Sequence, residues 1–294
     1  PDYIDPMFHR TVLEIPSRNL DSFFADEDTL RYLLGREVLE MEKFPESRIA
    51  VLEGVMGFYD GLGGVSERSS AWEVADLTDT PVILLVDMKG RSLSALASIK
   101  GFLDYKEKSH VTGIVFNRLS PMLYPGLKER AERELGIRVF GYVPELKDLT
   151  LESRHLGLVM PEEILGIRER LDLIKEKVRV GINLDGIIEE AGRAAEIEVK
   201  LPEAAGWSLS DRIPKKTVVA VAKDEAFCFY YEDNLDLLKK LGAEIQYFSP
   251  IHDRNLPEGT CAVYLGGGYP ELHAKALSEN ISMRNAIRQA VMEE

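Results

Sequence analysis

The sequence predicts an α/β protein in which a parallel-sheet domain is followed by part of a second α/β domain. Three observations support this prediction. Short apolar segments with the length of buried strands alternate with segments of helical periodicity, which is typical of βαβ units. Several apolar segments end on a polar side chain, as strands do at the ligand-binding edge of a parallel sheet. The alternation stops in a stretch containing Pro202, Gly206 and Pro214, and restarts at residue 217.

The first domain is expected to contain strands and helices in regular alternation, after an irregular start over residues 1–20. The predicted strands are residues 48–53, 81–87, 111–117 and 138–143. The predicted helices are residues 26–41, 71–77, 92–104 and 126–136. Ser92 or Ser94 is suited to cap the third helix, and Gly136 to end the fourth. Right-handed crossovers then place helices on both faces of the sheet.

The remaining chain divides at a linker predicted over residues 196–216, which gives domains 1–195 and 217–294. Two polar helices are expected before the linker, over residues 162–178 and 184–195. In the second domain the predicted strands are residues 217–222, 244–248 and 262–265. One helix is predicted over residues 231–241, and a last one after Ser278.

Composition excludes several classes of function. A net charge of −14 argues against non-specific nucleic-acid binding, because no basic surplus is present to displace counterions. The longest apolar run, residues 82–86, is far shorter than a membrane-spanning helix, so no membrane association is expected. Two cysteines, Cys228 and Cys261, do not make a disulfide framework. We therefore expect a cytoplasmic protein.

Carboxylates at two places in the first domain fit metal chemistry. Asp2 and Asp5 stand three residues apart, a pattern that suits a Mg²⁺ shell, although a solvated turn is the simpler interpretation. A buried strand is predicted to end on Glu53, and a glycine-rich loop that includes Asp60 follows. An acid at this edge suits a Mg²⁺ that bridges ATP phosphates. Acceptance of hydrogen bonds from loop N–H groups is the alternative interpretation.

Two other strands are predicted to end in groups that bind small molecules. One ends on Asn117, followed by Arg118. An amide can both donate to and accept from an adenine edge, although an Asx turn is the simpler interpretation. Gly266, Gly267 and Gly268 follow another strand. Consecutive glycines suit an oxyanion hole, and equally a flexible turn.

Neither cysteine is expected to be a nucleophile. Cys228 lies in an apolar cluster, and Cys261 precedes a strand, whereas a nucleophile elbow follows one. We interpret both as buried structural thiols. The histidines lack the spacing of a metal site: His9, His110, His155, His252 and His273.

Taken in order, a series of segments resembles the cobyrinate a,c-diamide synthase family. The segments are PDYIDPMFH (1–9), VLEGVMGFYDGLGG (51–64), PVILLVD (81–87), GIVFNR (113–118), RHLGL (154–158), DEAFCFYYEDNL (224–235) and YLGGGYPEL (264–272). The resemblance covers nearly the whole chain. It implies a dethiobiotin-synthetase-like domain of P-loop-NTPase type, followed by a class I glutamine amidotransferase domain of flavodoxin-like fold. It also implies a ligase of cobalamin biosynthesis that uses Mg²⁺, ATP and L-glutamine to amidate the a and c acetate carboxylates of cobyrinate through acyl phosphates.

The resemblance also implies roles for individual residues. Asp2, Asp5 and Glu53 correspond to acids of the Mg·ATP site, and Asn117 with Arg118 to the adenine-binding position. Gly267 and Gly268 correspond to part of the glutaminase oxyanion hole. Tyr3, Asp60, Arg154 and His155 are assigned to the tetrapyrrole substrate. A homodimer is a further expectation.

The chain departs from the family pattern at both ends. A glycine-rich phosphate loop precedes the PDYID segment in the family, and the nucleophilic cysteine follows the last residues present here. We therefore expect a chain truncated at both ends that neither binds ATP well nor hydrolyses glutamine, with exposed apolar surface at its sheet. Two alternatives to a cobyrinate-amidating enzyme stay open. The enzyme could amidate another tetrapyrrole, hydrogenobyrinate or nickel-sirohydrochlorin, or the protein could be a non-catalytic scaffold of the same fold.

Overall fold

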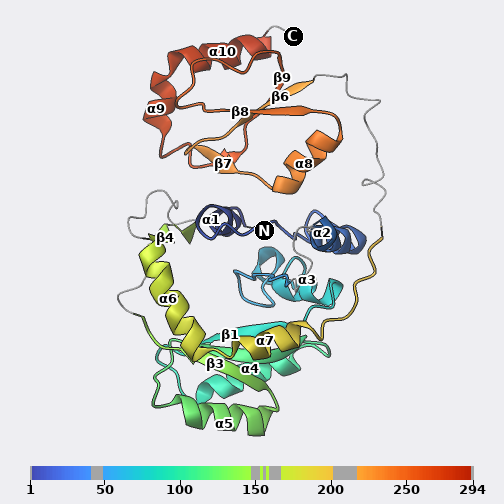
Figure 1. Cartoon of the computed structure of the whole chain (residues 1–294), viewed down its shortest axis with the longest axis vertical. Helices are drawn as coiled ribbons and strands as arrows, with labels where there is room; N and C mark the ends of the chain where they lie inside the picture. Colours follow the sequence, from blue (N-terminus) through green and yellow to red (C-terminus); the bar gives the residue numbers. More distant parts are fainter. Residues whose placement is uncertain are drawn as a thin grey trace. The chain divides into compact units, whose positions relative to one another are not determined.

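A computed structural model describes residues 2–40, 49–146, 153–154, 157–158, 167–200 and 217–292 (Figure 1). The chain forms two compact units. The central unit is Leu20–Pro202, and the carboxyl-terminal unit combines Glu203–Glu294 with Pro1–Asn19. The first residues therefore pack with the second unit, whereas the sequence-based boundary assigned residues 1–195 to one domain. None of the helices in the described ranges is long and apolar enough to cross a bilayer.

The central unit is built on a parallel sheet in the order β1-β2-β3. Its strands are β1 (Val82–Asp87), β2 (Val111–Asn117) and β3 (Arg138–Val143). The last two have the predicted bounds. The helices of this unit are α2 (Glu27–Glu40), α3 (Ala71–Leu77), α4 (Ser94–Asp104), α5 (Tyr124–Leu135), α6 (Ile167–Gly181) and α7 (Leu184–Ala191). Shorter elements are the 3-10 turn η1 (Leu62–Gly64) and the antiparallel pair β4 (Ser153–Arg154) and β5 (Gly157–Leu158).

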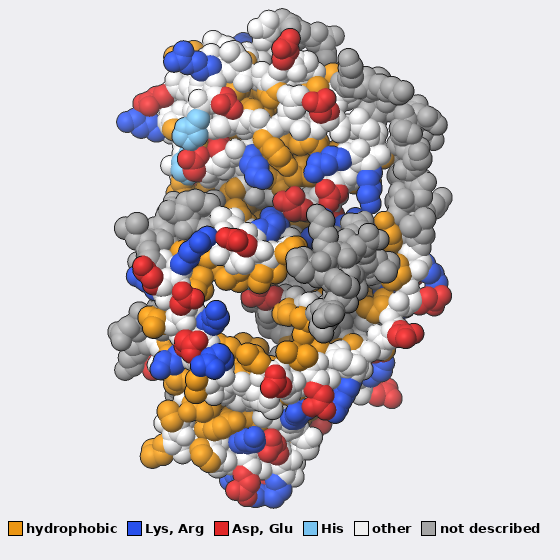
Figure 2. All heavy atoms as spheres, in the orientation of Figure 1, with side chains coloured by type: hydrophobic (Ala, Val, Ile, Leu, Met, Phe, Trp, Pro, Cys, Tyr) orange, Lys and Arg blue, Asp and Glu red, His pale blue; other side chains and the backbone are white. Residues whose placement is uncertain are grey.

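The core of the central unit is centred on β2, which is buried on both faces. Ile114 and Phe116 of this strand pack with Ile99 of α4 in one apolar cluster. A strand between two others in a parallel sheet is expected to be this apolar, and each such side chain stabilises the fold by roughly 1.5–3 kcal/mol. The outer face of α5 is instead covered by ion pairs such as Arg130–Glu134 at 2.8 Å, where Figure 2 shows interspersed red and blue side chains.

The predicted strand over residues 48–53 is wrong where the structure describes it. Residues 49–53 are irregular, and Val51 is 84% exposed. A strand needs a hydrogen-bonded neighbour, and no described strand pairs with this segment. β1 instead forms an edge of the described sheet, with Leu85 68% exposed.

The predicted serine cap of α4 is also wrong. The residue at the N-cap is Leu93, which makes no side-chain capping bond. Ser92 lies one position too early and instead accepts a bond from the N–H of Ala95 through its main-chain carbonyl, at 3.0 Å. The predicted end of α5 is confirmed, since Gly136 follows it in the left-handed conformation at φ 66°.

The carboxyl-terminal unit is built on a second parallel sheet, with β6 (Val218–Ala222) between β8 (Glu244–Phe248) and β9 (Thr260–Tyr264). Its helices are α1 (Ile4–Val12), α8 (Glu232–Lys240), α9 (Ala274–Glu279) and α10 (Ile281–Met292). Alternate residues of β6 pack against Leu235 of α8 and Met283 of α10, so these helices cover opposite faces (Figure 1). β7 (Phe227–Phe229) and β10 (Gly267–Gly268) form a separate antiparallel pair.

The expected irregular start over residues 1–20 is wrong, because α1 occupies part of it. The Asp2 carboxylate caps this helix, since its Oδ1 accepts bonds from the N–H groups of Ile4 at 2.7 Å and Asp5 at 3.1 Å. Pro6 falls in the first turn, where its missing N–H has no intrahelical partner to lose. Ile4 and Phe8 are buried on one face.

Candidate functional site

At the carboxyl edge of the central sheet, Asp87, Asn117 and Val143 stand in register. The Met88 N–H donates to the Asn117 carbonyl at 2.8 Å, which ties the two strand ends together. Asn117 is half-buried at this edge, the expected place for a ligand-binding side chain of a parallel sheet.

Arg118, which follows β2, pairs with Asp87 at the end of β1. Its Nε donates to Asp87 Oδ1 at 2.7 Å, and its Nη2 donates to Oδ2, a bidentate geometry. The pair holds the pKa of the Asp87 carboxyl below its usual range and raises the pKa of Arg118. The predicted strand over residues 81–87 ends on Asp87, to which the sequence alone gives no role. The structure shows that it fixes the guanidinium next to Asn117.

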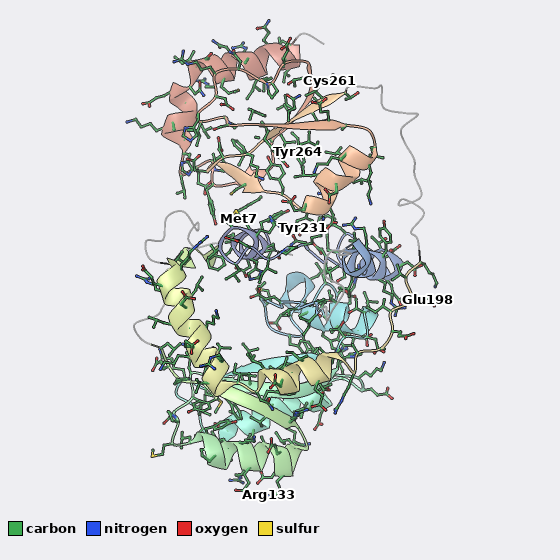
Figure 3. All side chains as sticks on the ribbon, viewed as in Figure 1. Met7, Arg133, Glu198, Tyr231, Cys261 and Tyr264 are labelled. Carbon is green, nitrogen blue, oxygen red and sulfur yellow. The ribbon has the colours of Figure 1, made fainter. Side chains whose placement is uncertain are left out.

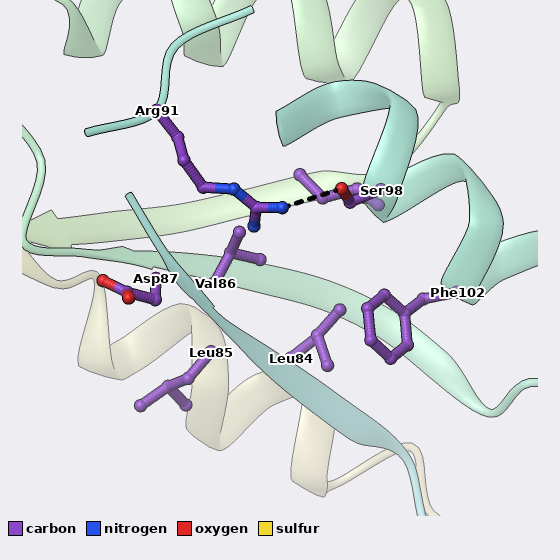
Figure 4. Close-up of a pocket in the computed structure, with 8 residues that line it drawn as sticks. Leu84, Leu85, Val86, Asp87, Arg91, Ser98 and Phe102 are labelled. Carbon is purple, nitrogen blue, oxygen red and sulfur yellow. Dashed lines mark hydrogen bonds between the residues drawn. The ribbon is translucent and has the colours of Figure 1, made fainter. Parts of the chain in front are cut away.

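A hollow is lined by α4 and by β1, an edge strand of the described sheet, as Figure 4 shows. Its apolar walls come from β1 and α4, through Leu84, Leu85, Val86, Ile99 and Phe102. Its polar lining consists of Asp87, Arg91 and Ser98, and Arg91 Nη2 donates to Ser98 Oγ at 3.1 Å. An apolar surface therefore adjoins the polar strand ends described above.

Glu53 and Asp60 are exposed in the central unit, on the segment before α3. The loop around Asp60 is tight, because the Asp60 N–H donates to the Gly57 carbonyl at 2.9 Å. A Cβ on Gly57 would lie 2.0 Å from Asp60 Oδ2, so a larger residue there would require this exposed carboxylate to turn away. Both acids are accessible to a ligand or a cation.

The other residues assigned to the substrate lie in different surroundings. Arg154 belongs to β4, where it pairs with Gly157 of β5. His155 lies outside the described residues. Tyr3 is 39% exposed in the carboxyl-terminal unit, immediately before α1.

Asp2 and Asp5 also lie in the carboxyl-terminal unit, whereas Glu53 belongs to the central one. The Oδ1 oxygen of Asp2 is used by the cap of α1, where the alternative interpretation was a solvated turn. Its Oδ2 takes no part in the cap and is the kind of oxygen that Mg²⁺ prefers. Among the described residues, no three His, Cys, Asp or Glu side chains are grouped to hold a metal ion.

The glycine run is held by the hydroxyl of Tyr230. The Gly266 N–H donates to Tyr230 Oη at 2.9 Å, and this hydroxyl donates to the Ala222 carbonyl at the end of β6 at 2.5 Å. Tyr230 is 7% exposed, and burial raises its pKa to about 12, although the Gly266 bond opposes the shift. Gly267 and Gly268 then form β10. The role of Tyr230 was not predicted, because nothing in its apolar sequence neighbourhood indicates this bridge.

Replacing Tyr230 with phenylalanine is expected to lower the free energy of unfolding by about 1–3 kcal/mol, since the change removes a partner from the half-buried Gly266 N–H and from the buried Ala222 carbonyl. Urea denaturation of the two proteins measures this difference. Tyr264→Phe removes a hydroxyl of the adjacent strand that is not part of the bridge. It should cost less than about 0.5 kcal/mol, and an equal cost for both changes would contradict the bridge.

The interpretation of both cysteines as buried thiols is wrong for Cys261, which is exposed, while Cys228 has intermediate exposure. Cys261, labelled in Figure 3, is the second residue of β9. This strand lies at the edge of the described sheet, where the Cys261 side chain is not covered. Neither cysteine lies in a turn that follows a strand, since Cys228 is within β7.

The turns after β6 and β8 are joined by the carboxylate of Asp224. It accepts bonds from Ser249 Oγ at 2.8 Å and from the Ile251 N–H at 2.9 Å. Beside it, His252 Nε2 lies 3.0 Å from the Glu225 carboxylate. This hydrogen bond raises the pKa of His252 and lowers that of Glu225.

The His252 imidazole is therefore expected to titrate above its ordinary pKa of about 6.5. Any stability that the pair contributes is present below that pH and is lost as the pH rises through the higher folded-state pKa. The chemical shift of the imidazole C–H against pH measures the midpoint, and Glu225→Gln should lower it. Asp253→Asn, which removes a weaker neighbouring charge, should lower it less. An unchanged midpoint in Glu225→Gln would contradict the assignment.

Comparisons with known proteins identify relatives along the chain. The CobB/CobQ-like glutamine amidotransferase domain matches residues 218–294. A cobyrinate a,c-diamide synthase of Caldanaerobacter subterraneus subsp. tengcongensis is 38% identical over 99% of this chain and 62% of its own length. The synthase of Listeria innocua is 37% identical over 99% of this chain and 62% of its own length. The synthase of Methanococcus vannielii is 38% identical over 98% of this chain and 63% of its own length.

The chain thus spans about 62% of the length of these curated relatives. No solved structure matches it significantly. The resemblance stated from the motifs is confirmed by these alignments, which extend over almost the whole chain.

Proposed function

The chain is a relative of the cobyrinate a,c-diamide synthases over almost all of its length, and on that premise we propose that the protein containing it is a glutamine-hydrolysing ligase of cobalamin biosynthesis. It amidates the a and c acetate carboxylates of cobyrinate at the expense of ATP. The observation that carries this proposal is the 38% identity across 294 residues, both units included.

The proposed reaction is an acyl-phosphate amidation. A carboxylate oxygen of the substrate attacks the γ-phosphorus of ATP, and ADP leaves. Ammonia from the hydrolysis of glutamine to glutamate then attacks the carbonyl carbon, and inorganic phosphate leaves with the oxygen. Each amide formed thus consumes one ATP, one glutamine and one water, and a second turnover amidates the second acetate. Bound Mg²⁺ offsets the charge that develops on the phosphates.

The acids described above are suited to the nucleotide side of this reaction. Asp2, Asp5 and Glu53 are proposed to serve Mg·ATP, because their carboxylate oxygens are hard donors and Asp2 Oδ2 lies outside the helix cap. Asn117 is proposed to contact adenine, with Arg118 oriented beside it by Asp87. The place of Asn117 at the carboxyl end of β2 supports its contact with adenine.

The remaining candidates are proposed for the substrate and for glutamine. Tyr3, Asp60, Arg154 and His155 are assigned to cobyrinate by their positions in the shared motifs, and the exposure of Asp60 supports its assignment. Gly267 and Gly268 are proposed to contribute N–H groups to the glutaminase oxyanion hole. Gly268 has φ 155°, a backbone conformation that residues with a side chain rarely adopt, so the strand is suited to glycine at this position.

The parallel order of both sheets supports a finer proposal about the fold. We infer that the central unit is dethiobiotin-synthetase-like, of P-loop-NTPase type, and the carboxyl-terminal unit flavodoxin-like, as in class I amidotransferases. A homodimer remains part of this proposal. Size-exclusion chromatography with light scattering on the complete protein measures it directly.

The complete gene product incubated with cobyrinate, Mg·ATP and glutamine tests the proposal. Two successive mass losses of about one unit, each with one ADP, are expected, because each step replaces a hydroxyl with an amino group. ADP formation that requires hydrogenobyrinate or nickel-sirohydrochlorin would keep the mechanism and change the substrate. No nucleotide turnover with any of the three would overturn the proposal in favour of a non-catalytic scaffold.

A further inference from the structure

The segment that carries Asp2 and Asp5 is attached to the carboxyl-terminal unit by an aromatic side chain between the two acids. The ring of Tyr3 stacks on Phe229 with centroids 5.2 Å apart and planes 11° from parallel. The ring of Tyr231, labelled in Figure 3, lies 4.9 Å from Tyr3. Two aromatic neighbours thus fix the residue between the acids.

Phe229 also touches the glycine strand. It is the cross-strand partner of Gly267 in the pairing of β7 with β10. A Cβ on Gly267 would lie 3.2 Å from the Phe229 Cβ, so the strand packs closely on this side chain. On its other side the Phe229 ring meets Tyr269, which follows Gly268, in an edge contact at 5.1 Å. One side chain therefore contacts both the acid-bearing segment and the glycine strand.

The far end of the same segment is held by ion pairs to α8. Arg18 Nη1 lies 3.1 Å from Asp233 and 2.8 Å from Asp236, and Arg10 lies 3.4 Å from Glu232. These carboxylates follow Tyr231 in the chain. Both ends of the segment are therefore anchored on the same unit, one on β7 and the other on α8.

We propose that Phe229 is a positioning residue that couples the Asp2 and Asp5 carboxylates to the Gly267 strand. Binding of Mg·ATP at the acids then changes how well ordered the glycine strand is, and binding of glutamine at the strand does the same to the acids. Thermodynamic linkage makes the effect reciprocal. The contacts form a contiguous path from Gly267 through Phe229 and Tyr3 to Asp2, which is the physical requirement for such coupling. This inference rests on the proposed function, because it assigns Mg·ATP to one end of the path and glutamine to the other.

The test uses the complete protein with Phe229→Ala and with Phe229→Tyr, which keeps the ring. Hydrogen exchange of the α1 amides, without any ligand, should be faster in Phe229→Ala and unchanged in Phe229→Tyr. Glutamine hydrolysis is then measured with and without Mg·ATP and cobyrinate. We expect stimulation in the wild type, a stimulation reduced by about 2- to 10-fold in Phe229→Ala, and recovery in Phe229→Tyr.

Tyr124→Leu is the matched control, since it removes a similar stacked ring, 4.3 Å from Tyr142, in the central unit. It should leave the stimulation intact. Full stimulation in Phe229→Ala, equal losses in the control, or absence of stimulation in the wild type would each overturn the coupling. Ammonia-dependent amidation in the same preparations reports on the proposed function separately, because it needs no glutamine.

Discussion

Gly268→Ala in the complete protein is expected to lower glutamine-dependent amidation by about 100-fold or more, the usual effect of losing an oxyanion-hole donor. A Cβ at this position would lie 2.1 Å from the Ala226 carbonyl oxygen and 3.1 Å from the Cys228 nitrogen. Both are main-chain atoms and cannot rotate away. The φ of 155° adds strain for any other residue. β10 must therefore separate from β7, and its N–H groups lose their orientation.

Amidation with ammonia in place of glutamine should persist in Gly268→Ala, because this reaction does not use the glycine strand. Gly101→Ala is the matched control, since its added Cβ would meet no atom within 4 Å in α4. This change should leave both reactions within twofold and stabilise the fold by up to about 1 kcal/mol. Equal loss of the ammonia-dependent and glutamine-dependent reactions in Gly268→Ala would contradict the assignment of this strand to glutamine.

Glu53→Gln is expected to produce the opposite pattern in the complete protein. The change keeps the size of an exposed side chain and removes the negative charge proposed to serve Mg·ATP. Because bound Mg²⁺ supplies several kcal/mol of charge stabilisation, ATP-dependent amidation should fall by about 100-fold or more with either nitrogen donor. Glutamine hydrolysis should continue at its unstimulated rate, since Gly267 and Gly268 belong to the other unit.

The measurements for Glu53→Gln are ADP release and glutamate release in the same assay. Glu129→Gln, which removes an exposed carboxylate paired with Arg133 on α5, is the control and should change neither rate by more than about twofold. Loss of both ADP and glutamate release in Glu53→Gln, with an unchanged circular dichroism spectrum, would contradict the assignment of this acid to the nucleotide.

Much of the central sheet is predictable from local sequence. β2 and β3 have their predicted bounds because each is a compact apolar run between turn residues. Residues 49–53 have the same apolar character, yet they are irregular, since a strand depends on a neighbour that its own residues do not specify. α1 was missed because three prolines suggested an irregular segment, whereas Pro6 is compatible with a first turn and Asp2 caps it.

The candidate site was predictable in its residue types and less so in its connections. Asn117 lies at the sheet edge, as a polar residue after a buried strand should. The Asp87–Arg118 pair and the Tyr230 bridge could not be predicted, because they join residues that only the tertiary fold brings together. For the same reason, no local pattern in Pro1–Asn19 indicates that it packs with Glu203–Glu294.

The attachment of the first residues to the carboxyl-terminal unit has a consequence for biosynthesis on the ribosome. Arg18 meets Asp233 across a separation of 215 residues, so the segment leaves the exit tunnel long before its partners exist. Until then, the apolar face with Ile4 and Phe8 must remain uncovered or be held by a chaperone. Closure of so long a loop is slow, and α1 is expected to dock last, after both sheets have formed. Pulse-labelled protease protection of nascent chains would detect this late step as resistance of α1 gained only after α8 has been synthesised.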